Sequence, residues 1–377
     1  MTRKRKQVPF LFLIFFLLAV GLVLFMMYAV YSNGQALGAP GSNVSTLNNL
    51  RYSIRLYKNL DLLKQKMEFS GQPERKFIIS NSDNALDICY KLEAELFVYS
   101  GVGTCDILTY KGTDRTLSPG TYTLPSGLNA IQVASFIADG TKRDLQFTIF
   151  AGWRLEEVAA VINQLDLGFT REEFLNFANF PPAEITQLLN MPAQRSLEGY
   201  MHPGFYSLKP TITLEEFVLQ SISRTKAVID EASQLTNTQS STLSSDQLII
   251  LASIIQRETL ESSEMPTIAS VFFNRLAISM RLETDPTVQY ALGFDPVMQT
   301  WWKSPLTYED LAVQSDYNTY QVNGLPPGAI SNPGRDAILA AFAPEQTGYY
   351  FFRAKCDGSF THNFAVTFEE HLANGCE

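Results

Sequence analysis

The chain contains few of the residues from which metal sites and nucleophile sites are built. Its 377 residues include only three histidines, His202, His362 and His371, and their spacing is not that of metal ligands. No CxxC pair is present, which argues against a zinc or thioredoxin-type site. No GxSxG motif, Walker motif or Cys–His pairing indicates another common enzyme class. We therefore expect neither a metal nor any other cofactor.

Basic residues are also in the minority. Lysines and arginines number 29 against 38 acidic residues, which gives a formal net charge of -9. A surface with this balance repels phosphate backbones, so nucleic acid is not expected as a partner.

The N-terminal region has a long segment without charges. Residues 8–31 are uncharged and mostly apolar, a basic cluster at 3–6 precedes them, and the next charged residue is Arg51. Such a helix is about 36 Å long at about 1.5 Å per residue, whereas a bilayer core is about 30 Å thick. We expect a single-pass anchor in the cell membrane, with 1–7 in the cytoplasm and the rest outside. A cleaved signal peptide with a weak site at 35–39 is the alternative, but the apolar segment is longer than a usual signal sequence.

Cysteine is scarce as well. The four cysteines, Cys89, Cys105, Cys356 and Cys376, all follow the apolar segment. An even number outside the cytoplasm suggests disulfides. Of the three possible connectivities, local pairing of Cys89 with Cys105 and of Cys356 with Cys376 is the simplest.

The remainder of the chain predicts an α+β fold with small domains. Residues 32–75 are expected to be a spacer, small and polar up to 49, with a helix or a strand left open over 50–75. Residues 76–165 alternate strands and helices, as in a small α+β domain. Residues 166–245 are expected to connect it to a second α+β domain over 246–377. Strands are expected at 76–79, 120–125, 145–150, 349–354 and 359–367, and helices at 85–96, 130–138, 155–165, 172–178, 214–229, 248–259, 266–278 and 336–343.

Glu258 is the residue on which the functional prediction rests. It lies near the end of the apolar helix predicted over 248–259, and Leu251, Ile254 and Ile255 precede it by seven, four and three positions. These residues share one face of a helix, so the carboxyl group lies on the apolar side. Burial raises the pKa of a carboxyl group, and a protonated carboxyl can act as a general acid. A glutamate at a helix end that simply reaches solvent is the alternative interpretation.

An ordered set of motifs makes the sequence similar to the YceG-like family of membrane-anchored endolytic murein transglycosylases. The similarity covers roughly residues 76 to 371. The motifs are LEGYMHP at 197–203, ASIIQRET at 252–259, ASVFFNRL at 269–276, MRLETDPTVQY at 280–290, YNTY at 317–320, GLPPGAI at 324–330 and HNF at 362–364, followed by EH at 370–371.

The resemblance implies a fold and an activity. Residues 76–165 would form a LysM-like domain that binds peptidoglycan glycan strands, and 246–377 would form the catalytic domain. The implied reaction cleaves the β-1,4 bond between MurNAc and GlcNAc within a strand and leaves a 1,6-anhydro-MurNAc end. The implied role is to terminate or trim nascent strands beside the cell-wall synthesis machinery.

One position departs from the family pattern. Members commonly carry Glu-x-Glu where this chain has Gln256 and Glu258. Only Glu258 can then be the acid. In the implied mechanism it donates a proton to the leaving glycosidic oxygen and then takes the proton of the MurNAc C6 hydroxyl as that oxygen attacks C1. The substrate supplies the nucleophile, so the second carboxylate of a hydrolase is unnecessary.

Other polar residues of the C-terminal domain are candidates for substrate binding. Asn274 is a candidate for orienting the acid or an N-acetyl group, or else a helix-surface or capping residue. Glu283 and Asp285 are candidate second carboxylates, with structural hydrogen bonding as the alternative. The other candidates suit sugar hydroxyls or stacking, although tyrosine is also common in cores; they are Gln289, Tyr317, Asn318 and Tyr320.

Two other functions remain open from the sequence. In the first, Gln256 marks the decay of an active site, and the protein is an inert scaffold that binds glycan. The retained Glu258 and Asn274 argue against this. In the second, Asp285 or Glu283 activates water, and the protein is a hydrolytic muramidase.

Overall fold

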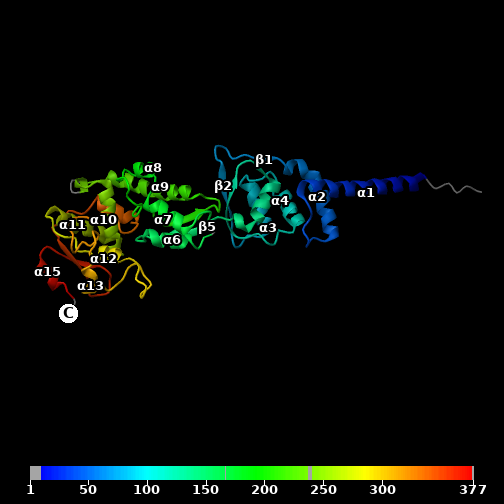
Figure 1. Cartoon of the computed structure of the whole chain (residues 1–377). Coiled ribbons are helices and arrows are strands. Elements are labelled where there is room, and N and C mark those ends of the chain that lie inside the picture. Colours follow the sequence, from blue (N-terminus) through cyan, green and yellow to red (C-terminus); the bar gives the residue numbers. More distant parts are fainter. Residues whose placement is uncertain (1–9, 166, 237–239, 376–377) are drawn as a thin grey trace, which may run out of the picture. The chain divides into compact units, whose positions relative to one another are not determined.

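The structure is a computed structural model that describes residues 10–165, 167–236 and 240–375 (Figure 1). The chain divides into two compact units, Met1–Leu145 and Gln146–Glu377. Helices and strands are mixed along both units, so the predicted α+β class is confirmed.

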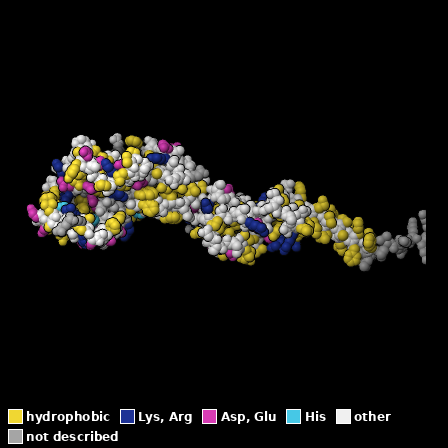
Figure 2. Space-filling view, turned by 90° about the horizontal axis from the view of Figure 1, so that it is seen from below, with side chains coloured by type: hydrophobic (Ala, Val, Ile, Leu, Met, Phe, Trp, Pro, Cys, Tyr) yellow, Lys and Arg dark blue, Asp and Glu magenta, His cyan; other side chains and the backbone are white. Residues whose placement is uncertain are grey.

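Helix α1 (Phe10–Leu37) is the apolar N-terminal segment. Its part Phe12–Leu37 is long and apolar enough to cross a membrane. Figure 2 shows hydrophobic side chains over this helix, and most of its large apolar side chains are exposed. The helix therefore contains most of the predicted span and continues beyond it to Leu37.

Helix α2 (Thr46–Leu63) lies inside the segment 32–75, so the prediction of a spacer is wrong for this part. Ser45 caps the helix, because its side chain accepts a hydrogen bond from the backbone N–H of Asn48. Leu56 and Leu63 are buried in the core of the first unit. The sequence hides this helix because tyrosines and basic residues interrupt its apolar positions.

The first unit packs helices against antiparallel strand pairs. Strand β2 pairs with β3 and β1 pairs with β4. Phe77 and Tyr122 lie opposite each other on β2 and β3, and both are fully buried. The elements are β1 (Lys66–Met67), β2 (Glu74–Ile79), α3 (Ala85–Ala94), α4 (Gly101–Lys111), β3 (Gly120–Pro125), β4 (Leu128–Asn129), α5 (Ala130–Ala138) and the 3-10 turn η1 (Gly140–Lys142).

A disulfide joins α3 to α4. It links Cys89 to Cys105, so the predicted local pairing is confirmed here. A Cβ atom on Gly101 would lie 2.3 Å from the Cys89 carbonyl oxygen, so glycine is needed where the two helices approach. Cys356 is also disulfide-bonded; its predicted partner, Cys376, lies outside the described residues.

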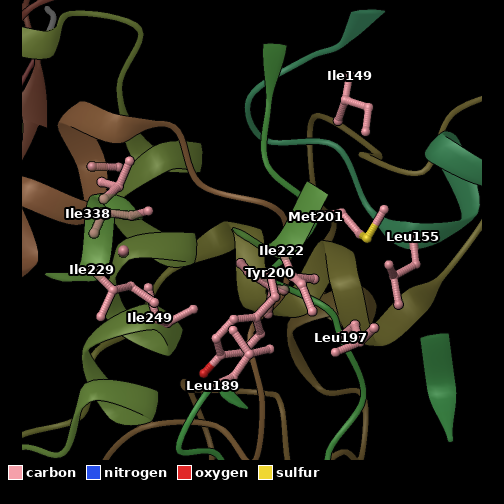
Figure 3. Packing of buried hydrophobic residues seen from close by; sticks show 14 of the residues in the cluster. Ile149, Leu155, Leu189, Leu197, Tyr200, Met201, Ile222, Ile229, Ile249 and Ile338 are labelled. Atoms are coloured by element: carbon pink, nitrogen blue, oxygen red, sulfur yellow. The ribbon is translucent and has the colours of Figure 1, made fainter. Parts of the chain in front are cut away.

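The second unit is built around one hydrophobic core (Figure 3). Its buried residues come from three predicted regions: Ile149 and Leu155 from the predicted first domain, Ile222 from the predicted connecting region, and Ile249 and Ile338 from the C-terminal domain. The predicted connecting region therefore shares its core with the C-terminal domain and does not fold as a separate connector.

The first domain also ends earlier than the predicted residue 165. Strand β5 (Leu145–Ile149) pairs with β6 (Gly204–Leu208), far along the chain. The Phe147 ring stacks on the Tyr206 ring with 5.3 Å between their centroids. These long-range contacts place residues 146–165 with the second unit.

Helices dominate the rest of the second unit. Helix α10 packs against α11, α12 and α14. The elements are α6 (Leu155–Ile162), α7 (Arg171–Asn179), α8 (Ala183–Leu188), α9 (Leu214–Ser233), η2 (Ser240–Thr242), α10 (Ser245–Glu258), η3 (Ser262–Glu264), α11 (Met265–Ala277), α12 (Asp285–Leu292), α13 (Tyr308–Leu311), α14 (Arg335–Phe342), β7 (Phe351–Ala354), β8 (His362–Ala365) and α15 (Phe368–Ala373).

Candidate active site

Helix α10 carries Glu258 as its last residue. Ser244 and Gln247 begin the helix with reciprocal side-chain-to-backbone hydrogen bonds, which satisfy free donors at its N-terminus. Residues 248–255 are all buried, so the helix is fixed on several sides. Thr259 is extended, and the chain turns away directly after the glutamate. The carboxyl group of Glu258 is thus carried by the end of a rigid, central helix.

Glu258 is half-buried, which combines a desolvating environment with access from outside. Burial, with a smaller contribution from the charge of Asp285, raises its pKa to about 8, while Arg275 and Arg257 oppose this shift. No hydrogen bond or ion pair to its carboxyl group is found among the described residues. The group is therefore mostly protonated at neutral pH and has its proton available to a ligand.

Buried threonines place Asp285 next to Tyr320. The Thr319 hydroxyl accepts a hydrogen bond from the Thr284 backbone N–H at 3.0 Å and lies 2.8 Å from the Thr287 hydroxyl. These contacts join the start of α12 to the segment 317–320. As a result the Tyr320 hydroxyl donates to Asp285 Oδ1 at 2.7 Å.

Asp285 and Tyr320 are the predicted site residues that the structure brings to Glu258. Both interact electrostatically with the Glu258 carboxyl. Burial, and then the hydrogen bond to Asp285, raise the pKa of the Tyr320 hydroxyl, so it remains a proton donor. Glu283 is exposed two residues before Asp285, with a positive φ of 49°.

Arg275 is a residue of this site that the sequence did not reveal. Its guanidinium is buried and donates to the carbonyl oxygens of Leu282 and Tyr350, each at 2.6 Å. It therefore holds the segment that leads to Asp285, and its charge also acts on Glu258. It lies in the predicted helix 266–278, but nothing in its local pattern separates a buried arginine from an exposed one.

The other predicted site residues have partners within the protein. Asn274 donates to the carbonyl oxygens of Thr347 and Tyr349, at 2.9 and 2.8 Å. Gln289 donates to the Lys303 carbonyl oxygen at 2.9 Å. These bonds fix loops around the site.

Asn318 and Tyr317 lie elsewhere in the same loop. Asn318 is fully buried and donates to two backbone carbonyl oxygens, those of Leu311 and Val313. Tyr317 packs its ring on Tyr290, with 4.8 Å between centroids. The contacts of both residues in the described structure are structural, and none of them connects either residue to Glu258.

Gln256, the residue that departs from the expected Glu-x-Glu pattern, supports another helix. Its Oε1 atom accepts a hydrogen bond from the backbone N–H of Gly334 at 2.8 Å. Gly334 is the N-cap residue of α14. A side-chain carbonyl oxygen is sufficient for this contact, so the amide retains the structural role while offering no titratable proton.

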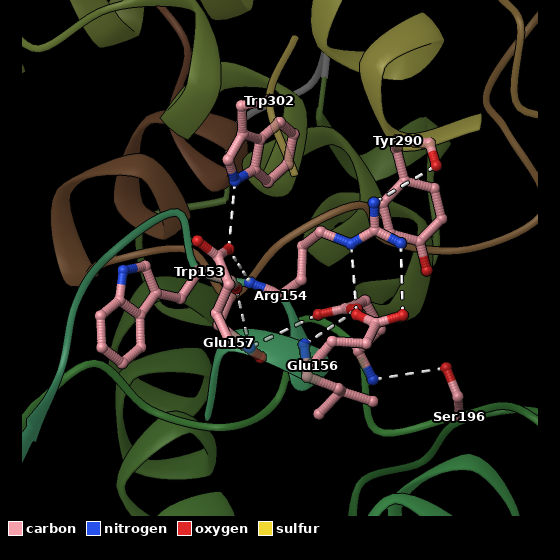
Figure 4. A network of polar contacts seen from close by, with 10 residues as sticks. Trp153, Arg154, Glu156, Glu157, Ser196, Tyr290 and Trp302 are labelled. Carbon is pink, nitrogen blue, oxygen red and sulfur yellow. Dashed lines mark hydrogen bonds and ion pairs between the residues drawn. The ribbon is translucent and has the colours of Figure 1, made fainter. Parts of the chain in front are cut away.

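A network of charged and aromatic side chains also borders the end of α10 (Figure 4). Arg154 forms an ion pair with Glu156 and lies over the Tyr290 ring, 4.1 Å from its centroid. Glu157 accepts a hydrogen bond from Trp302 Nε1 at 3.1 Å. The sequence analysis missed this network, although the adjacent glutamates after Arg154 and the tryptophan pair at 301–302 were visible signals.

Glu198, in the LEGYMHP motif, is a second carboxyl group with a raised pKa. Burial chiefly, and then the charge of Glu156, raise it to about 8. It accepts hydrogen bonds from the Leu155 backbone N–H at 3.2 Å and from Asn332 Nδ2 at 3.4 Å. Asn332 Oδ1 in turn accepts from the backbone of Gly199 at 3.0 Å. This motif joins the start of α6 to Asn332, which follows the Pro/Gly loop at 324–330.

The Pro/Gly loop lines a pocket at the other end of α10. The pocket has a volume of about 580 Å³. Gln247 and Ile250 of α10, Phe273 of α11 and the segment 324–327 are among its lining residues. Among the described residues, no group of three or more His, Cys, Asp or Glu side chains is placed to hold a metal ion.

Comparison with known proteins identifies the family. A model of the YceG-like family matches residues 77–376. The chain belongs to the YceG-like family. The resemblance predicted from the ordered motifs is thereby confirmed.

Relatives of this YceG-like chain carry functional names. A Bacillus subtilis (strain 168) protein named endolytic murein transglycosylase is 32% identical over 274 residues, which cover 70% of this chain and 73% of that protein. A protein of the same name from Streptococcus pneumoniae (strain ATCC BAA-255 / R6) is 27% identical over 324 residues, covering 79% of this chain and 57% of the relative.

A solved structure is also similar. The crystal structure of a YceG-like protein from Listeria monocytogenes has a TM-score of 0.55 and 29% sequence identity. The match covers 80% of this YceG-like chain and 98% of the Listeria chain.

Proposed function

We propose that this chain is an endolytic murein transglycosylase that cleaves the β-1,4 bond between MurNAc and GlcNAc within glycan strands. The family and the names of the Bacillus and Streptococcus relatives support the substrate class. The observation that carries the proposal is Glu258: a half-buried carboxyl group, raised to a pKa of about 8, at the end of a fixed helix.

The proposed chemistry uses one carboxyl group twice. Protonated Glu258 donates to the glycosidic oxygen as the C1–O bond breaks. The resulting carboxylate takes the proton of the MurNAc C6 hydroxyl while its oxygen bonds to C1. The products are a strand with a 1,6-anhydro-MurNAc end and a strand with a new GlcNAc hydroxyl, and no water is consumed. A pKa near the working pH suits a group that both gives and takes a proton.

Asp285 and Tyr320 are proposed to support this group. The negative charge of Asp285 stabilises the positive charge that develops at C1, and it keeps Glu258 protonated before reaction. Tyr320 holds Asp285 through their 2.7 Å hydrogen bond. Asn274, Glu283, Gln289 and Tyr317 remain proposed substrate-side residues. Asn318 was predicted with them, but it is fully buried and bonded to the backbone, so it supports the loop and does not reach a substrate.

The other parts of the protein are proposed to bring the substrate and the site together. Residues 76–165 are proposed to contain a LysM-like domain that binds glycan strands. Helix α1 is proposed to be a single-pass anchor, with the N-terminus in the cytoplasm and the catalytic unit outside. This placement favours action on nascent strands beside the cell-wall synthesis machinery.

A hydrolytic muramidase is the second candidate, because Asp285 is an exposed carboxylate near Glu258. An inert scaffold is the third. The test is to incubate the full-length chain, in detergent micelles, with uncrosslinked glycan strands and to weigh the products. Anhydro ends support the proposal, reducing ends support the muramidase, and intact strands support the scaffold. Glu258→Gln is expected to leave the strands intact.

A further inference from the structure

The loop after α12 is attached to the rest of the second unit by two tryptophans. Asp295 and Thr300 exchange backbone hydrogen bonds of 2.7 and 3.3 Å and close the loop. Trp301 then lies over the guanidinium of Arg154, and Trp302 lies over that of Arg257, with the Arg257 guanidinium carbon 3.8 Å from the ring centroid. Such stacks are favourable and fix a planar guanidinium against a ring.

Arg257 is held on more than one side. A Cβ atom on Gly152 would lie 3.1 Å from both Cδ and Nη1 of Arg257, so the backbone at Gly152 is in contact with this side chain. The Trp302 ring has its own fixed orientation, because its Nε1 donates to Glu157 Oε2. The same oxygen accepts the Arg154 backbone N–H at 2.9 Å. The helix cap of α6 thus determines where the Trp302 ring lies.

This arrangement matters because Arg257 directly precedes Glu258. Consecutive side chains on a helix point about 100° apart and do not face each other. Helix geometry alone therefore does not direct the Arg257 side chain toward the acid. With the stack, its guanidinium stays where it interacts with both Glu157 and Glu258. Among the described residues the two side chains form no direct ion pair, so the charge acts at a fixed distance.

We propose that Trp302 is a positioning residue of the active site: by holding the Arg257 guanidinium beside Glu258, it sets the positive charge that the acid/base group experiences. The inference rests on the proposed role of Glu258. The loop 293–303 would then be a part of the catalytic machinery that acts through Arg257 and needs no contact with the reacting atoms.

The other charges around Glu258 come from different elements. Asp285 acts from α12, Arg275 from α11 and the Tyr320 hydroxyl from the segment 317–320. On α14, Arg335 pairs with Glu231 of α9. None of these groups contacts Trp302 in the described structure; the charged group that Trp302 does contact is Glu157, which acts on Arg257.

The test is the pH dependence of the rate at which the full-length chain, in detergent micelles, forms anhydro ends from uncrosslinked strands. Arg257→Met should move the midpoint of the alkaline limb upward by roughly 0.5 to 1 pH unit, because a cation that favours the carboxylate is removed. Trp302→Met should move it in the same direction by less. The double variant should match Arg257→Met alone. Trp302→Phe keeps an aromatic face but loses the hydrogen bond to Glu157, so its midpoint should lie between those of the wild type and Trp302→Met.

An unchanged midpoint in Trp302→Met, a downward shift, or additive shifts in the double variant would each overturn the inference. Trp302→Leu serves as the second variant if Trp302→Met does not fold, as judged by thermal melting. Failure of the proposed function is distinguishable, because it would show as retained activity in Glu258→Gln whatever the Trp302 variants do.

Discussion

Replacing Glu258 by glutamine should make the second unit more stable, and increasingly so as the pH rises. The pKa of Glu258 is raised from 4.5 to about 8 in the folded protein. Between these values the unfolded chain has lost the proton and the folded chain retains it. The folded state then binds more protons, so the stability of the wild type falls as the pH rises through this window. Glutamine does not titrate, so the variant lacks this fall.

The size of the stability difference follows from the pKa shift of Glu258. A change of about 3.5 pKa units corresponds to about 5 kcal/mol at about 1.4 kcal/mol per unit, as an upper limit. Glu258 is half-buried, and solvent screening reduces this to about 1–3 kcal/mol. For a unit of this size, each kcal/mol changes Tm by about 2–4 °C. The Tm advantage of Glu258→Gln should therefore grow by about 2–12 °C between pH 5 and pH 8.5.

Thermal melts of both full-length proteins at a series of pH values provide the assay. The quantity to compare is the difference in Tm between the two proteins, and how much this difference grows with pH. Its absolute size is not informative, since the substitution also has a pH-independent effect. Glu283→Gln is the matched control, because it makes the same substitution at an exposed position of the same unit. A Glu258→Gln difference that is the same at pH 5 and pH 8.5 would refute the argument that burial holds the proton.

Three other changes have expected outcomes. Asp285→Asn should move the alkaline limb of activity to lower pH, because the charge that helps keep Glu258 protonated is lost; a pH–rate profile measures this, and an upward shift would contradict it. Replacing Cys89 and Cys105 by serine should destabilise the first unit by about 2–4 kcal/mol, as seen in urea unfolding followed by a probe in that unit, with the second unit unaffected. Asn332→Ala should cost the second unit more than about 2 kcal/mol, because buried backbone N–H groups lose their acceptor; unchanged urea unfolding would show that these bonds are not needed.

The sequence predicted the central helix and the apolar side on which Glu258 lies, because both depend on local patterns. The apolar spacing before Glu258 places the carboxyl on the buried side, and the helix ends where the pattern ends. Asp285 and Tyr320 were candidates by residue type. Their meeting at 2.7 Å depends on buried threonines 32 to 35 positions apart, which no local pattern encodes.

The missed features depend on long-range packing. The boundary near residue 145 follows from the pairing of β5 with β6, two strands that lie far apart in the sequence. Helix α2 was not predicted because polar residues interrupt its apolar stripe, and helix α4 was not predicted because it begins with Gly101. The stack of Arg257 on Trp302 joins two segments that lie far apart in the sequence, so no local pattern predicts this contact.

The central claim is that Glu258 cleaves glycan strands without water. The most direct measurement is the mass of the products formed by the full-length chain in water enriched in heavy oxygen. We expect anhydro-MurNAc ends that contain no heavy oxygen, and no products from Glu258→Gln. Reducing ends that carry heavy oxygen, or full activity of Glu258→Gln, would contradict it.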